Sequence, residues 1–167
     1  IFKGNLGEFF ETAQLKKFEP NGVLLHYSLP ELKRSFYQTP LHERQNFYAQ
    51  QLNIIKRTIE SFSFSPQHIF ISIHEMASDE VYGQHGFQNE NAFLFQILKI
   101  RQELGRFNPD NAVVGLLNIG NSCFNAPFYY ATECDISLEA MPLVAHQFLQ
   151  MLNARLGKMI KCVIVDL

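Results

Sequence analysis

Cys123 is the residue of this 167-residue sequence whose surroundings most favour a chemical role. It follows a short apolar run at residues 112–119 and the break Gly120-Asn121, and it precedes Pro127, a residue tolerated in a first helical turn. This order predicts a buried strand, a sharp turn and a helix, with Cys123 beside the unpaired backbone N–H groups of the helix start. Such surroundings stabilise a thiolate, so Cys123 is a candidate nucleophile. The alternative is a small buried apolar residue, because free cysteines are among the most buried residue types.

Histidine and carboxylate side chains offer a second kind of chemistry. His26 lies in an expected strand, where a hydrogen-bonded structural histidine is favoured over a pocket residue. The segment Glu75–Gln88 follows another expected strand, and ligands of open α/β sheets bind beyond the carboxyl ends of strands. We expect this segment to be the wall or lid of a site, with neither a metal ion nor an organic cofactor, because its ligand spacing matches no recognised motif. The residues considered as metal ligands are His74, Glu75, Asp79 and His85.

Alternating β-type and helical patterns must position these side chains. Their order predicts a layered α/β fold, with a mainly parallel sheet and helices on both faces, and a single domain over residues 1–167. The nearly continuous apolar character of residues 113–118 predicts one of the inner strands. The expected strands cover residues 22–29, 68–74, 113–118 and 161–167, and the main expected helices cover residues 5–18, 41–62, 91–104 and 137–156.

Composition limits the partners and the compartment. The formal net charge of −2 gives no electrostatic footprint for nucleic acid or an anionic membrane, and no apolar run has membrane length. Three cysteines without C-x-x-C spacing argue against a disulfide framework and a zinc site, which favours a reducing, cytoplasmic location. Only 18% of residues are charged and sixteen are phenylalanine, so we expect apolar surface that meets another polypeptide. A chain that begins at Ile1 rather than Met is expected to be a processed or truncated piece.

Three stretches resemble the amino-terminal half of thiolase-fold condensing enzymes, especially the ketoacyl synthase III type. Tyr48–His74 is similar to a helix, a proline-containing link and a strand of that family, and Asn91–Gly105 to its next helix. Gly115–Ala131 is similar to the strand and nucleophile turn, with Cys123 at the catalytic position. The resemblance spans residues 45–167 and departs from the family at Phe124, where a glycine is usual soon after the cysteine. The histidine and asparagine that the family also uses belong to a half of the fold that this chain lacks.

This resemblance implies an acyltransferase or condensing-enzyme component of fatty acid or polyketide biosynthesis. Cys123 would attack an acyl thioester of acyl carrier protein or coenzyme A and form an acyl-enzyme. The implied partner is a second copy, in a homodimer, or a second thiolase-like half. The alternative is a non-catalytic thiolase-like subunit or interaction module that pairs with a catalytic partner. An unrelated α/β hydrolase is disfavoured, because Phe124 replaces the second glycine of a G-x-S-x-G nucleophile elbow.

Overall fold

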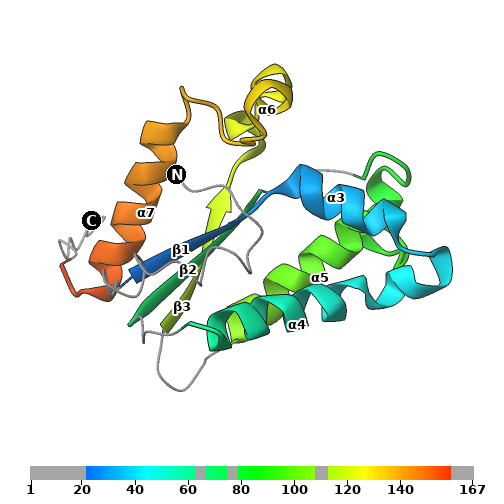
Figure 1. Ribbon diagram of the computed structural model, residues 1–167, viewed down its shortest axis with the longest axis horizontal. Helices are drawn as coiled ribbons and strands as arrows, with labels where there is room; N and C mark the ends of the chain where they lie inside the picture. The colour runs from blue at the N-terminus through cyan, green and yellow to red at the C-terminus, as the bar shows by residue number, and fades with distance from the viewer. Residues whose placement is uncertain (1–21, 63–66, 75–78, 108–112, 159–167) are drawn as a thin grey trace, which may run out of the picture. The chain divides into compact units, whose positions relative to one another are not determined.

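The computed structural model describes residues 22–62, 67–74, 79–107 and 113–158, which belong to two compact units, residues 1–121 and 122–167. The first unit contains a sheet and the helices between its strands (Figure 1). The turn η3 connects it to the second unit, which contains two helices. The elements of the first unit are β1 (Gly22–Tyr27), α3 (Leu29–Gln38), η1 (Leu41–Asn46), α4 (Phe47–Glu60), β2 (His68–His74), η2 (Gln84–Phe87), α5 (Phe93–Arg106) and β3 (Val113–Ile119), followed by η3 (Asn121–Cys123), α6 (Ala126–Thr132) and α7 (Met141–Arg155).

The sheet is parallel, and its described strands lie in the order β1-β2-β3. Leu25 of β1 pairs with Ile71 of β2, which pairs in turn with Leu116 of β3. Both crossovers run in the same direction, and right-handed connections then place their helices on the same face of the sheet. Figure 1 shows α3, α4 and α5 together on that face. The prediction of a mainly parallel α/β sheet is confirmed, whereas helices on a second face stay an expectation.

The core of the first unit lies between the sheet and these helices. Alternate residues of β2, such as Ile71 and Ile73, face the helices because side chains of a strand alternate between its two faces. The ring of Phe36 in α3 meets Phe47 at 5.2 Å and Phe93 at 5.3 Å, measured between ring centroids. These three phenylalanines are at most 1% exposed, so part of the aromatic content of the chain serves its own core.

Strand β2 holds the central position among the described strands. Its residues from Ile69 to His74 are all buried, on both faces of the sheet, as expected for the centre of a parallel sheet. Among the described strands β3 pairs with β2 alone, and the expected strand at 161–167 lies outside the described residues, so the prediction that residues 113–118 form an inner strand stays a prediction. An apolar run is compatible with either position, because helices also cover one face of β3, where Val114 and Leu116 are half-buried.

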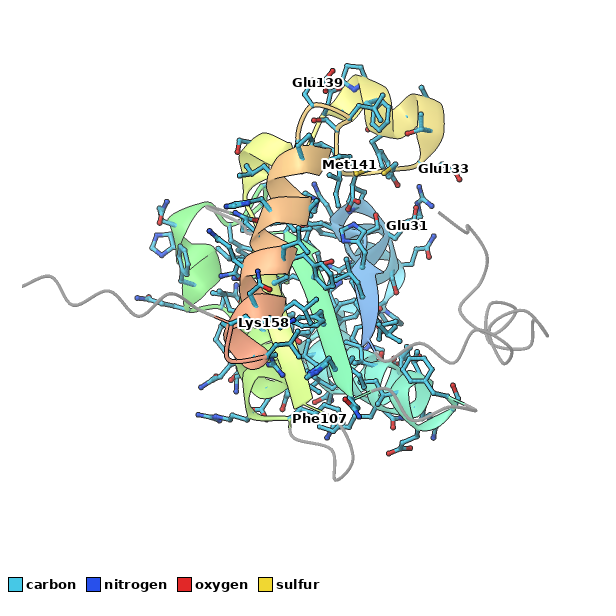
Figure 2. The ribbon with its side chains drawn as sticks, turned by 90° about the vertical axis from the view of Figure 1, so that its left-hand side faces the viewer. Glu31, Phe107, Glu133, Glu139, Met141 and Lys158 are labelled. Carbon is cyan, nitrogen blue, oxygen red and sulfur yellow. The ribbon has the colours of Figure 1, made fainter. Side chains whose placement is uncertain are left out.

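The second unit begins with a tight turn and two helices. Pro127 lies in the first turn of α6, and the side chain of Asn125 accepts a hydrogen bond of 3.0 Å from the backbone N–H of Phe128. Figure 2 labels Met141 at the start of α7 and Lys158 beyond its end. Of the described helices, none is long and apolar enough to cross a membrane. The expected strand at 161–167 and the expected helix at 5–18 lie outside the described residues.

Candidate functional site

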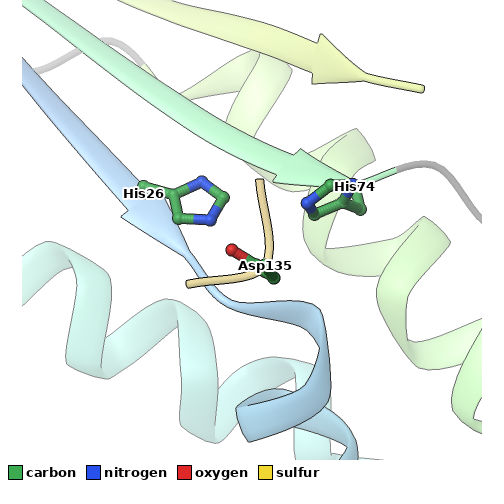
Figure 3. A group of neighbouring side chains, drawn as sticks. All are labelled: His26, His74 and Asp135. Atoms are coloured by element: carbon green, nitrogen blue, oxygen red, sulfur yellow. The ribbon is translucent and has the colours of Figure 1, made fainter. Parts of the chain in front are cut away.

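Two histidines lie at the carboxyl ends of adjacent parallel strands. His26 is near the end of β1 and His74 ends β2, and their ring centroids are 5.8 Å apart in an edge-to-face arrangement (Figure 3). His26 pairs in register with Ser72, so His74 is the next residue on the same face of the sheet. His74 is 1% exposed, whereas His26 is exposed. This edge is where open α/β sheets bind ligands, and it therefore forms the candidate site.

Ser72 orients the ring of His26. The Ser72 Oγ atom lies 2.8 Å from His26 Nδ1, and the Ser72 hydroxyl donates a longer hydrogen bond of 3.5 Å to the carbonyl of Leu25. The 2.8 Å contact orients the imidazole ring, and which of its two atoms donates depends on the tautomer of His26.

The contact between Ser72 and His26 also has the distance of an activated nucleophile and its base. Ser72, however, is 1% exposed and lies within the central strand, where a substrate carbonyl or phosphorus atom has no access to its hydroxyl. Ser72 is therefore a positioning residue for His26. Ser72 has no sequence signal of this role, because only the strand register places it against a histidine 46 residues away.

Asp79 uses its carboxylate to organise the chain that follows β2. Its Oδ1 accepts hydrogen bonds from the backbone N–H groups of Val81 at 2.9 Å and Tyr82 at 3.0 Å, and its Oδ2 accepts one from Leu94 at 3.0 Å. Burial raises the pKa of Asp79, but hydrogen bonds from the backbone at Leu94, Tyr82, Val81 and Phe93 stabilise the charged form, and the net pKa lies below the ordinary value. Asp79 therefore fastens the segment after β2 to the start of α5.

The segment from Asp79 to Phe87 is folded tightly around that carboxylate. The backbone N–H of Gly83 donates to the carbonyl of Asp79 at 2.8 Å, and Gly83 adopts a positive φ of 54°. A Cβ atom at Gly86 would lie 2.6 Å from the Cβ of Asp79, so only glycine fits there. The wall-or-lid role of this segment stays a prediction.

The described carboxylates that follow β1 and β2 already form ion pairs or hydrogen bonds with other groups of the protein. Glu31 accepts a hydrogen bond of 2.9 Å from Arg34, Glu80 pairs with Lys33, and Asp79 accepts from the backbone as described. Of the other residues considered as metal ligands, His85 is exposed in η2 and Glu75 lies outside the described residues. Among the described residues of the first unit, the edge of the sheet therefore offers imidazoles and a hydroxyl instead of carboxylate oxygens.

Cys123 and Asp135 belong to the second unit. Cys123 is 2% exposed in the three-residue turn η3, and its carbonyl accepts a hydrogen bond of 2.8 Å from Ser137. The prediction that Cys123 lies at a helix start is wrong, because Asn125 caps the helix and α6 begins at Ala126. The catalytic role of Cys123 stays a prediction. Asp135 is 1% exposed, and no motif in the sequence singles it out.

Comparisons with known proteins identify relatives of this chain. A family model described as the FkbH N-terminal domain matches residues 9–153. A crystal structure described as the N-terminal part of the protein BF1531 from Bacteroides fragilis, containing a phosphatase domain complexed with Mg, matches with a TM-score of 0.79 and 19% identity. The match covers 96% of this chain and 45% of that chain, and at this identity it shows a shared fold. Among curated proteins, none matches this chain.

The predicted membership of the thiolase-fold condensing enzymes is wrong, because the family match is to the FkbH N-terminal domain and the structural match is to BF1531. The acyltransferase or condensing-enzyme function, its ketoacyl synthase form and the alternative of a thiolase-like subunit are wrong with it. The stretches that suggested the resemblance encode a helix, a link and a strand in a parallel α/β order. That order recurs in many unrelated families, so it carries little information about function.

Proposed function

Because this chain belongs to the FkbH N-terminal domain family, we propose that it binds the phosphate-bearing substrate of a larger protein with phosphatase activity. The observation that carries this proposal is the match to BF1531, whose description includes a phosphatase domain complexed with Mg. This chain spans 45% of the length of that structure. The part of the BF1531 structure that this chain does not match is long enough for a separate catalytic domain.

The chemistry of the described residues supports a binding role for the first unit. Magnesium prefers carboxylate and other oxygen ligands in a nearly octahedral arrangement. The carboxylates of Glu31, Asp79 and Glu80 are engaged by Arg34, by backbone N–H groups and by Lys33, respectively. The described carboxylates that follow β1 and β2 in the first unit are therefore poor candidates for magnesium ligands, and we place the metal-dependent hydrolysis outside these residues.

The histidines of the edge suit an anionic substrate. Imidazole N–H groups donate hydrogen bonds to phosphate oxygens, and these bonds become stronger when the ring is charged. His26 is exposed and is oriented by Ser72, so it is the group that contacts the substrate, while the buried His74 lines the edge beside it. Neither residue has to exchange a proton with the substrate in this role, because His26 binds and orients the substrate.

Titration with a phosphate monoester tests the binding role. We expect phenyl phosphate to shift the imidazole NMR signals of His26 in a saturable way, and His26→Gln to weaken the binding by about tenfold, the loss of one charge-assisted hydrogen bond. His42 is the internal control, because its side chain is 80% exposed and lies in η1, at the opposite end of α3 from β1. Equal shifts at His26 and His42, or no saturable shift at His26, would contradict the proposal.

An activity assay tests the placement of catalysis. We expect the 167-residue chain with magnesium to show no hydrolysis of p-nitrophenyl phosphate above the rate of the buffer. Magnesium-dependent hydrolysis by this chain that resists further purification would contradict a role limited to binding. The two assays fail independently, since one measures occupancy at His26 and the other measures turnover.

A further inference from the structure

Helices α4 and α5 carry a local excess of positive charge. They pack against each other on one face of the sheet (Figure 1). The chain has 14 basic and 16 acidic residues, and these two helices hold five of the basic and two of the acidic ones. The rest of the chain is therefore net acidic. The basic residues are Lys56, Arg57, Lys99, Arg101 and Arg106, and the acidic ones are Glu60 and Glu103.

Three of these cations have no carboxylate partner. Arg106 pairs with Glu103 at 3.3 Å, but Lys56, Arg57 and Lys99 form no ion pair with any residue that the structure describes. Lys56 and Arg57 are exposed, and Lys99 is half-buried. We call the surface around these three residues the basic face. Its charge is not neutralised within the described chain, so it attracts external anions.

Aromatic rings hold the two lysines in place. The Nζ atom of Lys99 lies 5.4 Å from the ring centroid of Tyr48 and 5.7 Å from that of Phe95, and the Nζ atom of Lys56 lies 5.4 Å from that of Phe107. Such contacts position an ammonium group and leave its charge in place. Tyr48 and Lys56 both belong to α4, so the two ammonium groups lie at levels about 12 Å apart along this helix.

Charge and spacing together select the occupant of the basic face. Carboxylates that are two turns apart on one side of an α-helix are separated by about 11 Å, which matches the levels of the two lysines. Leu98, beside Lys99 in α5, is 38% exposed and offers apolar contact to such a helix. We propose that the basic face binds an acidic α-helix of a protein partner, with carboxylates of that helix at Lys56 and Lys99.

A nucleic acid suits the basic face less well than an acidic helix. Double-stranded DNA carries about one negative charge per 1.7 Å, and the proteins that bind it neutralise many phosphates with an extended basic surface. The basic face offers three unpaired cations, and the rest of this chain is net acidic, so a long polyanion would meet repulsion beyond the face. A short acidic helix would contact the basic face alone.

The basic face is separate from the candidate site. Leu25 and Tyr27 of β1 belong to the core beneath the helices, and His26 between them points to the opposite face of the sheet. The helices α4 and α5 and the ring of His26 therefore lie on opposite sides of the sheet. Binding of a partner at the basic face goes beyond the proposed function, because it needs no phosphate-bearing substrate.

Fluorescence anisotropy with a defined peptide tests the inference. The probe is a labelled, alanine-based helical peptide of about 20 residues with glutamates two turns apart on one side. We expect saturable binding to the 167-residue chain that weakens as the salt concentration rises. We expect Lys56→Gln and Lys99→Gln each to weaken it by about two- to fivefold, and the double variant by about tenfold, as for ion pairs at an exposed surface.

Lys158→Gln is the matched control, because it removes the same charge from an exposed lysine of the second unit and should leave the affinity unchanged. Circular dichroism checks the fold of each variant. No saturable binding of the peptide, or equal affinity in the double variant and Lys158→Gln, would overturn the inference. Tighter binding of a DNA oligonucleotide than of the peptide would also overturn it, in favour of a nucleic acid. None of these results involves His26, so none bears on the proposed function.

Discussion

The carboxylate of Asp79 and the imidazole of His26 are two ionisable groups of the first unit with opposite uses. Asp79 accepts three hydrogen bonds from backbone N–H groups, on both of its oxygens. His26 is oriented through one ring nitrogen by the side chain of Ser72. A carboxylate surrounded by backbone donors organises the local fold, whereas the exposed ring of His26 is oriented by another side chain. The hydrogen-bond partners of an ionisable group, more than its residue type, therefore decide whether it stabilises the fold or contacts a ligand.

Removing the carboxylate of Asp79 should have the largest effect on stability. Asp79→Ala leaves backbone donors of Val81, Tyr82 and Leu94 without their acceptor, and we expect a loss of about 3 kcal/mol or more. Urea denaturation of the purified chain measures this loss. Glu80→Ala is the control, because Glu80 is 74% exposed and its ion pair with Lys33 is worth little. Equal losses of unfolding free energy in the two variants would show that the carboxylate of Asp79 does not stabilise the fold.

Adding a methyl group beside Asp79 should have the next largest effect. The new Cβ atom of Gly86→Ala would lie 2.6 Å from the Cβ of Asp79, so we expect a loss of about 1–3 kcal/mol from overpacking. Gly105→Ala is the matched control, because a Cβ atom there meets nothing within 4 Å and alanine favours the helix. We expect Gly105→Ala to be neutral or stabilising in the same urea experiment. A Gly86→Ala variant as stable as Gly105→Ala would show that the segment adapts freely.

The charge of Asp79 should make stability depend on pH in a defined direction. The pKa of Asp79 in the folded chain lies below its ordinary value of 3.8, so its contribution is fully present above that value and is lost as the pH falls through the folded pKa. Asp79→Asn removes the charge at every pH. We therefore expect the stability difference between wild type and Asp79→Asn to be larger at pH 6 than at pH 3. A difference that stays constant, or grows towards pH 3, would contradict this assignment.

Replacing His26 should have the smallest effect on stability. The residue is exposed and its ring forms a side-chain hydrogen bond with Ser72, so we expect His26→Gln to cost no more than about 1 kcal/mol. Urea denaturation, measured beside the phosphate titration, then separates the effect of His26→Gln on ligand binding from its effect on folding. A loss for His26→Gln as large as that for Asp79→Ala would make His26 a structural residue and end the contrast between the two groups.

The local elements of this protein were largely determined by the sequence. The alternation of residues 22–27 and 68–74 and the apolar run at 113–119 are strands, and the apolar pattern after Asn91 is the helix Phe93–Arg106. One helical pattern is divided in the structure, because Leu41–Asn46 is a 3-10 helix and α4 begins at Phe47. Periodicity arises from neighbouring residues, so a single sequence carries it reliably.

Neither the family of the chain nor the partners of the site residues followed from these local patterns. Generic helix and strand patterns suggested a thiolase-like half, which the family match corrects. The position of Cys123 was misjudged because Asn125, two residues later, is the residue that caps α6. The predicted partner polypeptide and the cytoplasmic location stay predictions.

Only the tertiary structure decided which polar groups meet. Ser72 faces His26 across 46 residues because β1 and β2 pair in one particular register, and a shift of one residue would turn every side chain of the strand to the opposite face. Asp79 reaches Leu94 because the segment between them folds back upon the start of α5. The sequence by itself determined that this chain alternates strands and helices; the pairing of distant strands decided that one ionisable residue is structural and another is available for chemistry.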